Sequence, residues 1–185
     1  MIAEPKRREQ FSEWRTWAMV CVLAETGVRR TSLLNVRVKD VDFYNHRIKF
    51  GHTKNGDEQE LPIDDELERR LKKYLSKWEP EPDKFLFPNQ YGEQLNVSYS
   101  SSMLNAYETK RGVKARGFHC YRRMVARTLA RSCATAPQIS KQLGHKGGEM
   151  ASLSIQLVTN DLVSLLPNNP LAQAAKVNKQ IKVKN

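Results

Sequence analysis

The sequence lacks paired cysteines, a long apolar run and an apolar leader. Its cysteines are Cys21, Cys120 and Cys133, an odd number without any CxxC spacing. This argues against a disulfide framework or a zinc site and fits reduced thiols. No stretch approaches the roughly 18 apolar residues of a membrane span, and residues 1–8 carry charges without the apolar core of a signal peptide. We therefore expect a cytoplasmic protein with no membrane contact and no metal.

Acidic residues are also few compared with basic ones. The 185 residues contain 31 Lys and Arg against 20 Asp and Glu, which gives a net charge of +11. This excess favours a polyanionic partner, although charge alone also fits a ribosomal or merely soluble basic protein. The length is sufficient for one domain with its own hydrophobic core.

Hydrophobic periodicity predicts a mainly helical chain. The expected helices cover residues 11–27, 31–36, 64–78, 98–110, 118–131, 137–143 and 148–164. Thr31 and Asp64 are the predicted N-caps of their helices. Met124 and Val125 are both expected to be buried in the helix at 118–131.

Residues 41–63 interrupt the helices with a stretch rich in strand formers. Asn55-Gly56 is a strong hairpin signal, and Asn45-His46 predicts a second turn. Three antiparallel strands are therefore expected. The predicted fold class is mainly α with a small three-stranded antiparallel sheet, that is, α+β.

The domain is expected to end where the helical pattern ends. Pro167 and Pro170 break that pattern, and the last residues are basic and poor in apolar side chains. We therefore expect one domain over residues 1–166 and a basic tail over residues 167–185.

Five residues have the chemistry to hold a phosphodiester. Arg29 lies in the turn between two predicted helices, and its guanidinium is a planar fork that matches two phosphate oxygens. Lys54 stands at a hairpin turn, where an ammonium can enter a DNA groove or protonate a leaving alkoxide. His119 and Arg122 are three residues apart and share one helix face, and His145 follows a predicted helix end. Each residue alone also has an ordinary structural interpretation, such as a surface arginine or a core histidine.

These residues stand in motifs whose order is informative. The chain contains TGVR with Arg29, HTKNG with Lys54, HCYR with His119 and Arg122, and LGHK with His145. Together they resemble the catalytic domain of tyrosine recombinases, the family of phage lambda integrase. Each motif is weak alone, but the order, the spacing and the hairpin agree over about residues 10–158.

The resemblance implies a phosphoryl transfer that needs no metal and no cofactor. Arg29, His119, Arg122 and His145 would stabilise the pentavalent phosphate, and Lys54 would act as the general acid. In the family a tyrosine attacks the phosphate and forms a 3′-phosphotyrosine link. The implied partner is double-stranded DNA, bound by the residues Arg29, Lys54, Arg122, Arg123 and Lys146.

The sequence departs from the family pattern at the nucleophile. The family tyrosine follows the histidine by nine residues, and that position is Ser154 here. No tyrosine follows Tyr121. A serine hydroxyl is less acidic and shorter than the tyrosine phenol, and it needs an activating base. Ser32 replaces the usual acidic residue, and Arg123 replaces the usual histidine.

Three interpretations of the function stay open. In the first, the chain has a recombinase fold, binds specific DNA without cutting it, and serves as a phage or mobile-element regulator, as repressors of SPbeta-like phages do. In the second, it is an integrase whose tyrosine has been replaced. A basic structural or RNA-binding protein with chance motifs is the third. The resemblance also implies an oligomer on DNA and an N-terminal core-binding domain, which is expected in the family but not in this chain.

Overall fold

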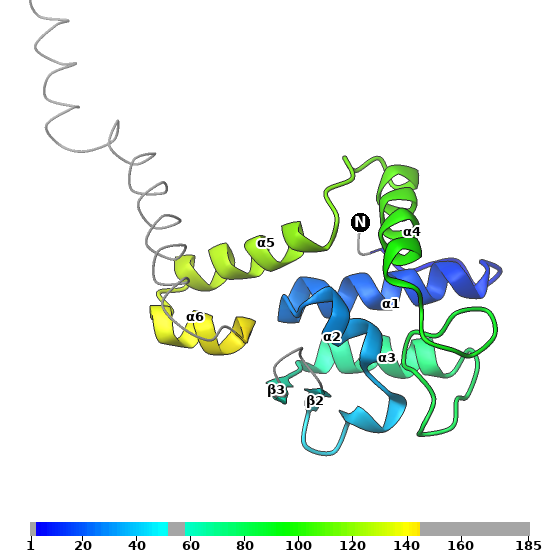
Figure 1. The fold of residues 1–185 in the computed structure, drawn as a ribbon, viewed down its shortest axis with the longest axis horizontal. Coiled ribbons are helices and arrows are strands. Elements are labelled where there is room, and N and C mark those ends of the chain that lie inside the picture. Colours follow the sequence, from blue (N-terminus) through cyan, green and yellow to red (C-terminus); the bar gives the residue numbers. More distant parts are fainter. Residues whose placement is uncertain (1–2, 52–57, 145–185) are drawn as a thin grey trace, which may run out of the picture.

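The computed structural model describes residues 3–51 and 58–144 (Figure 1). The helices are α1 (Phe11–Thr26), α2 (Arg30–Asn35), α3 (Asp65–Leu75), α4 (Val97–Lys110), α5 (Phe118–Arg131) and α6 (Ala136–Leu143). A short 3-10 helix, η1 (Val38–Asp40), precedes the strands β1 (Val41–Asp42), β2 (Arg47–Phe50) and β3 (Gln59–Pro62). The strands form one antiparallel sheet in the order β1-β2-β3, so the predicted fold class is confirmed. The predicted helix at 148–164 and the tail at 167–185 lie outside the described residues.

Helix α1 forms the centre of the fold because it is buried on nearly all sides. Trp17, Met19 and Leu23 are fully enclosed. Helices α3, α4 and α5 pack against α1, and Figure 1 shows α5 and α6 on one side of the remaining elements. Burying this many large apolar side chains supplies the main driving force for folding.

The sheet follows the expected pattern of alternating burial. Ile48 and Phe50 on β2 are buried, and Ile48 pairs with Leu61 on β3. The predicted turn before β2 is confirmed, because Asp42 Oδ1 accepts the backbone N–H groups of the next turn residues and His46 has a φ of 52°. The second predicted turn, Asn55-Gly56, lies outside the described residues.

Gly27 ends α1 as predicted. Its φ of 62° is left-handed, and its N–H donates to the carbonyl of Leu23 at 3.0 Å. This is a common helix ending, and it favours glycine because other residues are strained there. The chain reverses sharply after Gly27, which places Arg29 in the short connection before α2.

Three local predictions need correction or qualification. Thr31 does not cap α2: the helix begins at Arg30, and Arg29 occupies the N-cap position with no side-chain cap. Asp64 does cap α3, since its carboxylate accepts from the N–H of Leu67 at 2.7 Å, but that helix ends at Leu75 rather than near residue 78. Met124 is 40% exposed because only one stripe of α5, which includes Val125, packs on α1.

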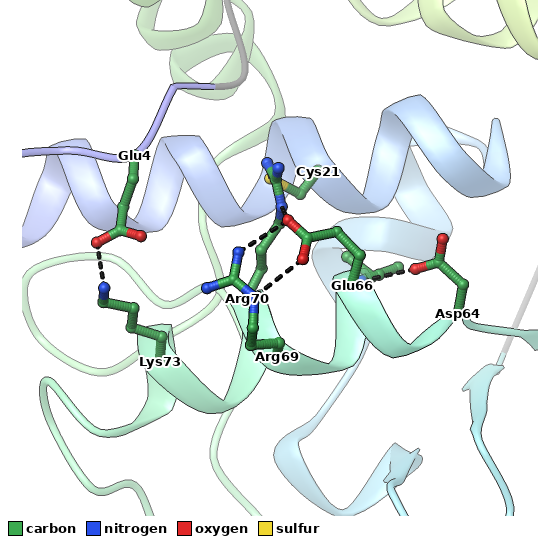
Figure 2. Close-up of polar contacts among 8 residues, drawn as sticks. Glu4, Cys21, Asp64, Glu66, Arg69, Arg70 and Lys73 are labelled. Carbon is green, nitrogen blue, oxygen red and sulfur yellow. Dashed lines mark hydrogen bonds and ion pairs between the residues drawn. The ribbon is translucent and has the colours of Figure 1, made fainter.

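Helix α3 carries several ion pairs along its length (Figure 2). Glu66 accepts from Arg69 Nη2 at 2.8 Å and from Arg70 Nε at 2.7 Å. Lys73 pairs with Glu4 on the N-terminal segment. Arg69 and Arg70 are therefore both paired with the carboxylate of Glu66. Within the described residues, no helix has the length and apolar character needed to cross a bilayer.

Glu25 lies beside these ion pairs and predicts a pH dependence of stability. Its Oε1 accepts the N–H of Asp64 at 2.9 Å, and burial raises the pKa of Glu25 to about 7 from its ordinary 4.5. A folded pKa above the unfolded value means that the folded state binds more protons between pH 4.5 and 7. The contribution of Glu25 to the free energy of unfolding is therefore largest below pH 4.5, and it is lost as the pH rises through 7.

Glu25→Gln keeps the acceptor for Asp64 and removes the buried charge. We expect the variant to exceed the wild type in free energy of unfolding by about 1–3 kcal/mol at pH 8, after allowance for solvent screening, and to match it near pH 4.5. Urea unfolding at several pH values measures both curves, with exposed Glu60→Gln as the control. A difference between wild type and variant that stays constant with pH would contradict the assignment.

Candidate functional site: an arginine-lined pocket

Helices α5 and α6 are seated on the end of α1 at Gly27. Val125 and Leu143 belong to a small apolar cluster between these helices. A β-carbon placed on Gly27 would lie 3.1 Å from Val125 Cβ and 2.9 Å from Leu143 Cδ2. The absence of a side chain at Gly27 therefore lets the end of α6 approach the turn that carries Arg29.

Gly27→Ala is expected to destabilise the protein by about 2–4 kcal/mol, from a strained left-handed residue and overpacking against Leu143. Gly92→Ala is the matched control, since Gly92 has a φ of 81° but nothing within 4 Å of an added β-carbon. It should cost only the backbone strain, about 1 kcal/mol. Urea unfolding of both variants measures the difference. Equal losses would show that the close packing at Gly27 is unimportant.

The last carbonyls of α6 are held by side chains from three other elements. Gln59 Nε2 on β3 donates to the carbonyls of Lys141 at 3.1 Å and Gln142 at 2.7 Å. Arg122 Nη2 donates to the carbonyl of Leu143, and Arg29 Nη1 donates to that of Gly144 at 2.6 Å. Carbonyls at a helix C-terminus lack helical partners and carry partial negative charge. They therefore orient both arginines before any ligand arrives.

Arg122 is the most enclosed charged group of the site. Its side chain is 7% exposed, and Nη1 donates to the carbonyl of Gly27 at 3.0 Å. Burial, together with the nearby guanidinium of Arg29, lowers the pKa of Arg122 to about 10. Arg122 thus stays charged at neutral pH. The proximity of two guanidinium groups favours a negative ligand between them.

Arg29, His119 and Arg122 line one open pocket of about 540 Å³. His119 is exposed in the first turn of α5, on the same side as Arg122, as the helical spacing predicts. Arg123 is exposed and does not line the pocket. The other predicted site residues, Lys54, His145, Lys146 and Ser154, lie outside the described residues.

The pocket is strongly positive in the part of the chain that the structure describes. None of its described lining residues is Asp or Glu; these residues are Val28, Arg29, Arg30, Thr31, Ser101, Arg116, Gly117, Phe118, His119 and Arg122. Among the described residues, Arg29, Arg30 and Arg116 form no ion pair with a carboxylate, in contrast to Arg69 and Arg70 in Figure 2. Unbalanced cations that line a hollow focus positive potential there. An anion with several oxygen atoms suits this pocket.

Metal ligands are not gathered anywhere in the described residues, which hold no cluster of three His, Cys, Asp or Glu side chains. Ser32, which stands where the family pattern has an acidic residue, is buried and supplies no carboxylate to Arg29. The arginine is held by the Gly144 carbonyl instead.

Three residues of the site were not predicted from the sequence. Arg30 and Arg116 line the pocket, and Gln59 holds the end of α6. Arg30 is a second arginine directly after the TGVR motif, and Arg116 precedes Gly117, the N-cap of α5. These positions, next to a motif and next to a helix start, were the sequence signals that could have pointed to the two arginines. Gln59 had none, because its partners are more than 80 positions away.

Comparison with known proteins identifies the fold. The model of the phage integrase family matches residues 1–156. The chain is 32% identical over 144 residues to tyrosine recombinase XerA of Saccharolobus solfataricus, which covers 78% of this chain and 46% of that protein. It is 26% identical over 160 residues to putative integrase/recombinase y4gC of Sinorhizobium fredii, covering 84% of this chain and 83% of that one.

A solved structure supports the same assignment. The post-cleavage complex of XerH recombinase with palindromic difH substrate aligns with a TM-score of 0.73 and 20% identity, over 88% of this chain and 48% of that one. The chain thus spans about half the length of XerA and XerH, and the likeness to XerH concerns the fold. The expected recombinase fold is confirmed. The chain belongs to the phage integrase family, with the fold of a tyrosine recombinase catalytic domain.

Proposed function

We propose that the chain binds double-stranded DNA in the arginine-lined pocket and does not cut it. One observation carries the proposal: the end of α6 pre-orients Arg29 and Arg122 at a pocket that Arg30 and Arg116 also line, and none of the described lining residues is Asp or Glu. A DNA phosphate supplies the missing negative charge, and arginine binds phosphate through paired N–H donors. The structural neighbours support DNA as the ligand, since the Tn1549 transposon integrase was solved in complex with circular intermediate DNA and XerH with a difH substrate.

The proposal assigns a role to each site residue. Arg29, His119 and Arg122 hold one backbone phosphate, and Lys54 and His145 complete that site. Arg123 and Lys146 contact DNA nearby. In this proposal residues 1–166 form the DNA-binding domain, residues 167–185 form a basic tail, and copies of the chain assemble on DNA.

The absence of cleavage rests on the nucleophile position. Ser154 stands nine residues after His145, and no tyrosine follows Tyr121. Phosphate contacts and sequence-specific binding do not require that tyrosine. We therefore propose a regulator of a phage or mobile element, such as a repressor. It would act in the cytoplasm, where its DNA is.

A second function is favoured by a specific observation. Arg29 and Arg122 are both held by the end of α6 at one pocket, which is an arrangement suited to stabilising the charge of an attacked phosphate. The alternative is an integrase in which Ser154 replaces the tyrosine, and the natural protein would then cut and rejoin DNA through a 3′-phosphotyrosine intermediate.

The experiment is selection of bound duplexes from a random pool, followed by titration at several salt concentrations. We expect an enriched site and an affinity that falls with salt, with a log–log slope of about −0.9 for each phosphate contacted. Binding to the selected duplex should exceed binding to a scrambled duplex of equal length. Equal affinity for both duplexes would contradict a specific regulator.

A further inference from the structure

We propose that Arg30 and Arg116 form a second phosphate subsite in the same pocket, which takes the phosphate next to the one held by Arg29, His119 and Arg122. This inference rests on the proposed DNA binding. It adds that the pocket grips two successive phosphates of one strand. Both arginines are among the described residues that line the pocket.

Arg30 is held in place by two neighbouring helices. Its Nη1 donates to Ser101 Oγ on α4 at 2.7 Å, and its guanidinium lies 5.7 Å from the centre of the Phe118 ring on α5. These contacts fix the side chain without neutralising it, because a hydroxyl and an aromatic ring leave the charge in place. An arginine fixed in this way loses little conformational entropy when an anion binds.

Arg116 brings a second cation from the loop before α5. Its backbone N–H donates to Glu108 Oε2 at 3.0 Å, which anchors the loop to α4. The other oxygen of Glu108 accepts from the Tyr121 hydroxyl at 2.8 Å, and Glu108 is buried. The Arg116 side chain is exposed and has no hydrogen bond or ion pair with the described residues. Its guanidinium is therefore available to a ligand.

The size and charge of the pocket both favour more than one phosphate. The open pocket of about 540 Å³ is lined by residues of α2, α4, α5 and the loop before α5, so a ligand longer than one phosphate group can lie across it. Four arginines line it, and one phosphodiester carries one negative charge. One bound phosphate therefore leaves arginine charge that a second phosphate can balance.

A purely structural role for Arg30 is the competing explanation, because Arg30 also ties α2 to α4 and α5. Ser101→Ala separates the two roles. It removes the hydrogen bond of Arg30 and keeps the charge, so it should leave the salt dependence of DNA binding as it is. Arg30→Gln removes the charge and should lower that dependence.

The experiment measures the affinity of the whole chain for its selected duplex at several salt concentrations. We expect Arg30→Gln and Arg116→Gln each to reduce the log–log salt slope by about 0.9, and the double variant by about twice that. Arg30→Lys should retain the slope. Arg37→Gln is the matched control, because Arg37 also stacks on a phenylalanine, 4.7 Å from the Phe85 ring centre, but lies outside the pocket lining.

The outcomes separate this inference from the proposed function. If the wild type binds no duplex, the proposed function fails, and the subsite fails with it. If the wild type binds with a salt slope that Arg30→Gln and Arg116→Gln leave intact, DNA binding stands and the second subsite is wrong. If Ser101→Ala lowers the slope as much as Arg30→Gln, or if Arg37→Gln lowers it equally, the assignment to Arg30 is also overturned.

Discussion

Arg122→Met is expected to weaken both folding and DNA binding. Methionine fills most of the buried space but leaves the carbonyls of Gly27 and Leu143 without their donor. Hydrogen bonds from charged groups contribute about 1.5–3 kcal/mol each, so the free energy of unfolding should fall by about 2–5 kcal/mol. The lost phosphate contact should lower DNA affinity by about 10–100-fold.

Two measurements check this prediction. Urea unfolding gives the stability change, and anisotropy titration with the selected duplex gives the affinity change. Arg127→Gln, an exposed change on the same helix, should alter stability by less than about 0.5 kcal/mol. Arg122→Lys should bind DNA more tightly than Arg122→Met but less tightly than the wild type, because lysine keeps the charge and loses the planar fork. A folded Arg122→Met protein with unchanged DNA affinity would contradict the placement of the phosphate.

Ser154→Tyr is expected to create covalent attachment to DNA where the wild type has none. The substitution puts a phenol at the position that the family uses for attack, nine residues after His145. The arginines that would stabilise the attacked phosphate already converge at one pocket. Stabilisation of developing charge is the largest contribution to many such reactions, so supplying the nucleophile should be sufficient for the first step.

A duplex with a nick close to the attacked phosphate traps the product. Cleavage then releases a short fragment that diffuses away, so the strand cannot be rejoined and the protein stays attached. The adduct is counted as protein that stays on labelled DNA in a denaturing gel. Ser154→Phe is the matched control, since it has the ring without the hydroxyl. Adding Arg29→Ala to Ser154→Tyr should abolish the adduct. An adduct that survives Arg29→Ala, or none from a variant that binds the duplex fully, would show that the pocket is not organised for phosphoryl transfer.

The helices were largely predictable because their signals are local. Apolar spacing marks α1, and a glycine that tolerates a left-handed conformation marks its end at Gly27. The cap at Asp64 follows from the preference of a carboxylate for free N–H groups. Thr31 was misjudged because the extended backbone at Arg29 already ends the turn, so α2 starts one residue earlier.

The candidate site was predictable only in part. Arg29, His119 and Arg122 belong to motifs, and they do line one pocket. Arg30 and Arg116 were missed because the pocket forms where α2, α4 and the loop before α5 meet, and no local pattern reports a meeting of distant segments. The bonds from Arg29 and Arg122 to the end of α6 depend on the same long-range packing.

These bonds connect the fold to the proposed function. The end of α6 is seated on Gly27, its terminal carbonyls orient the two arginines, and β3 holds the same helix end through Gln59. The stability of this junction and the shape of the phosphate pocket are therefore coupled. A change that loosens α6, such as Gly27→Ala, should also weaken DNA binding.

The most direct test uses the unaltered protein with its selected duplex, bound under native conditions and then denatured. We predict a saturable complex that disappears completely on denaturation, because the chain grips phosphates and has no tyrosine at position 154. A fraction of the DNA that remains joined to the protein after denaturation would contradict the proposal, and so would the absence of a native complex.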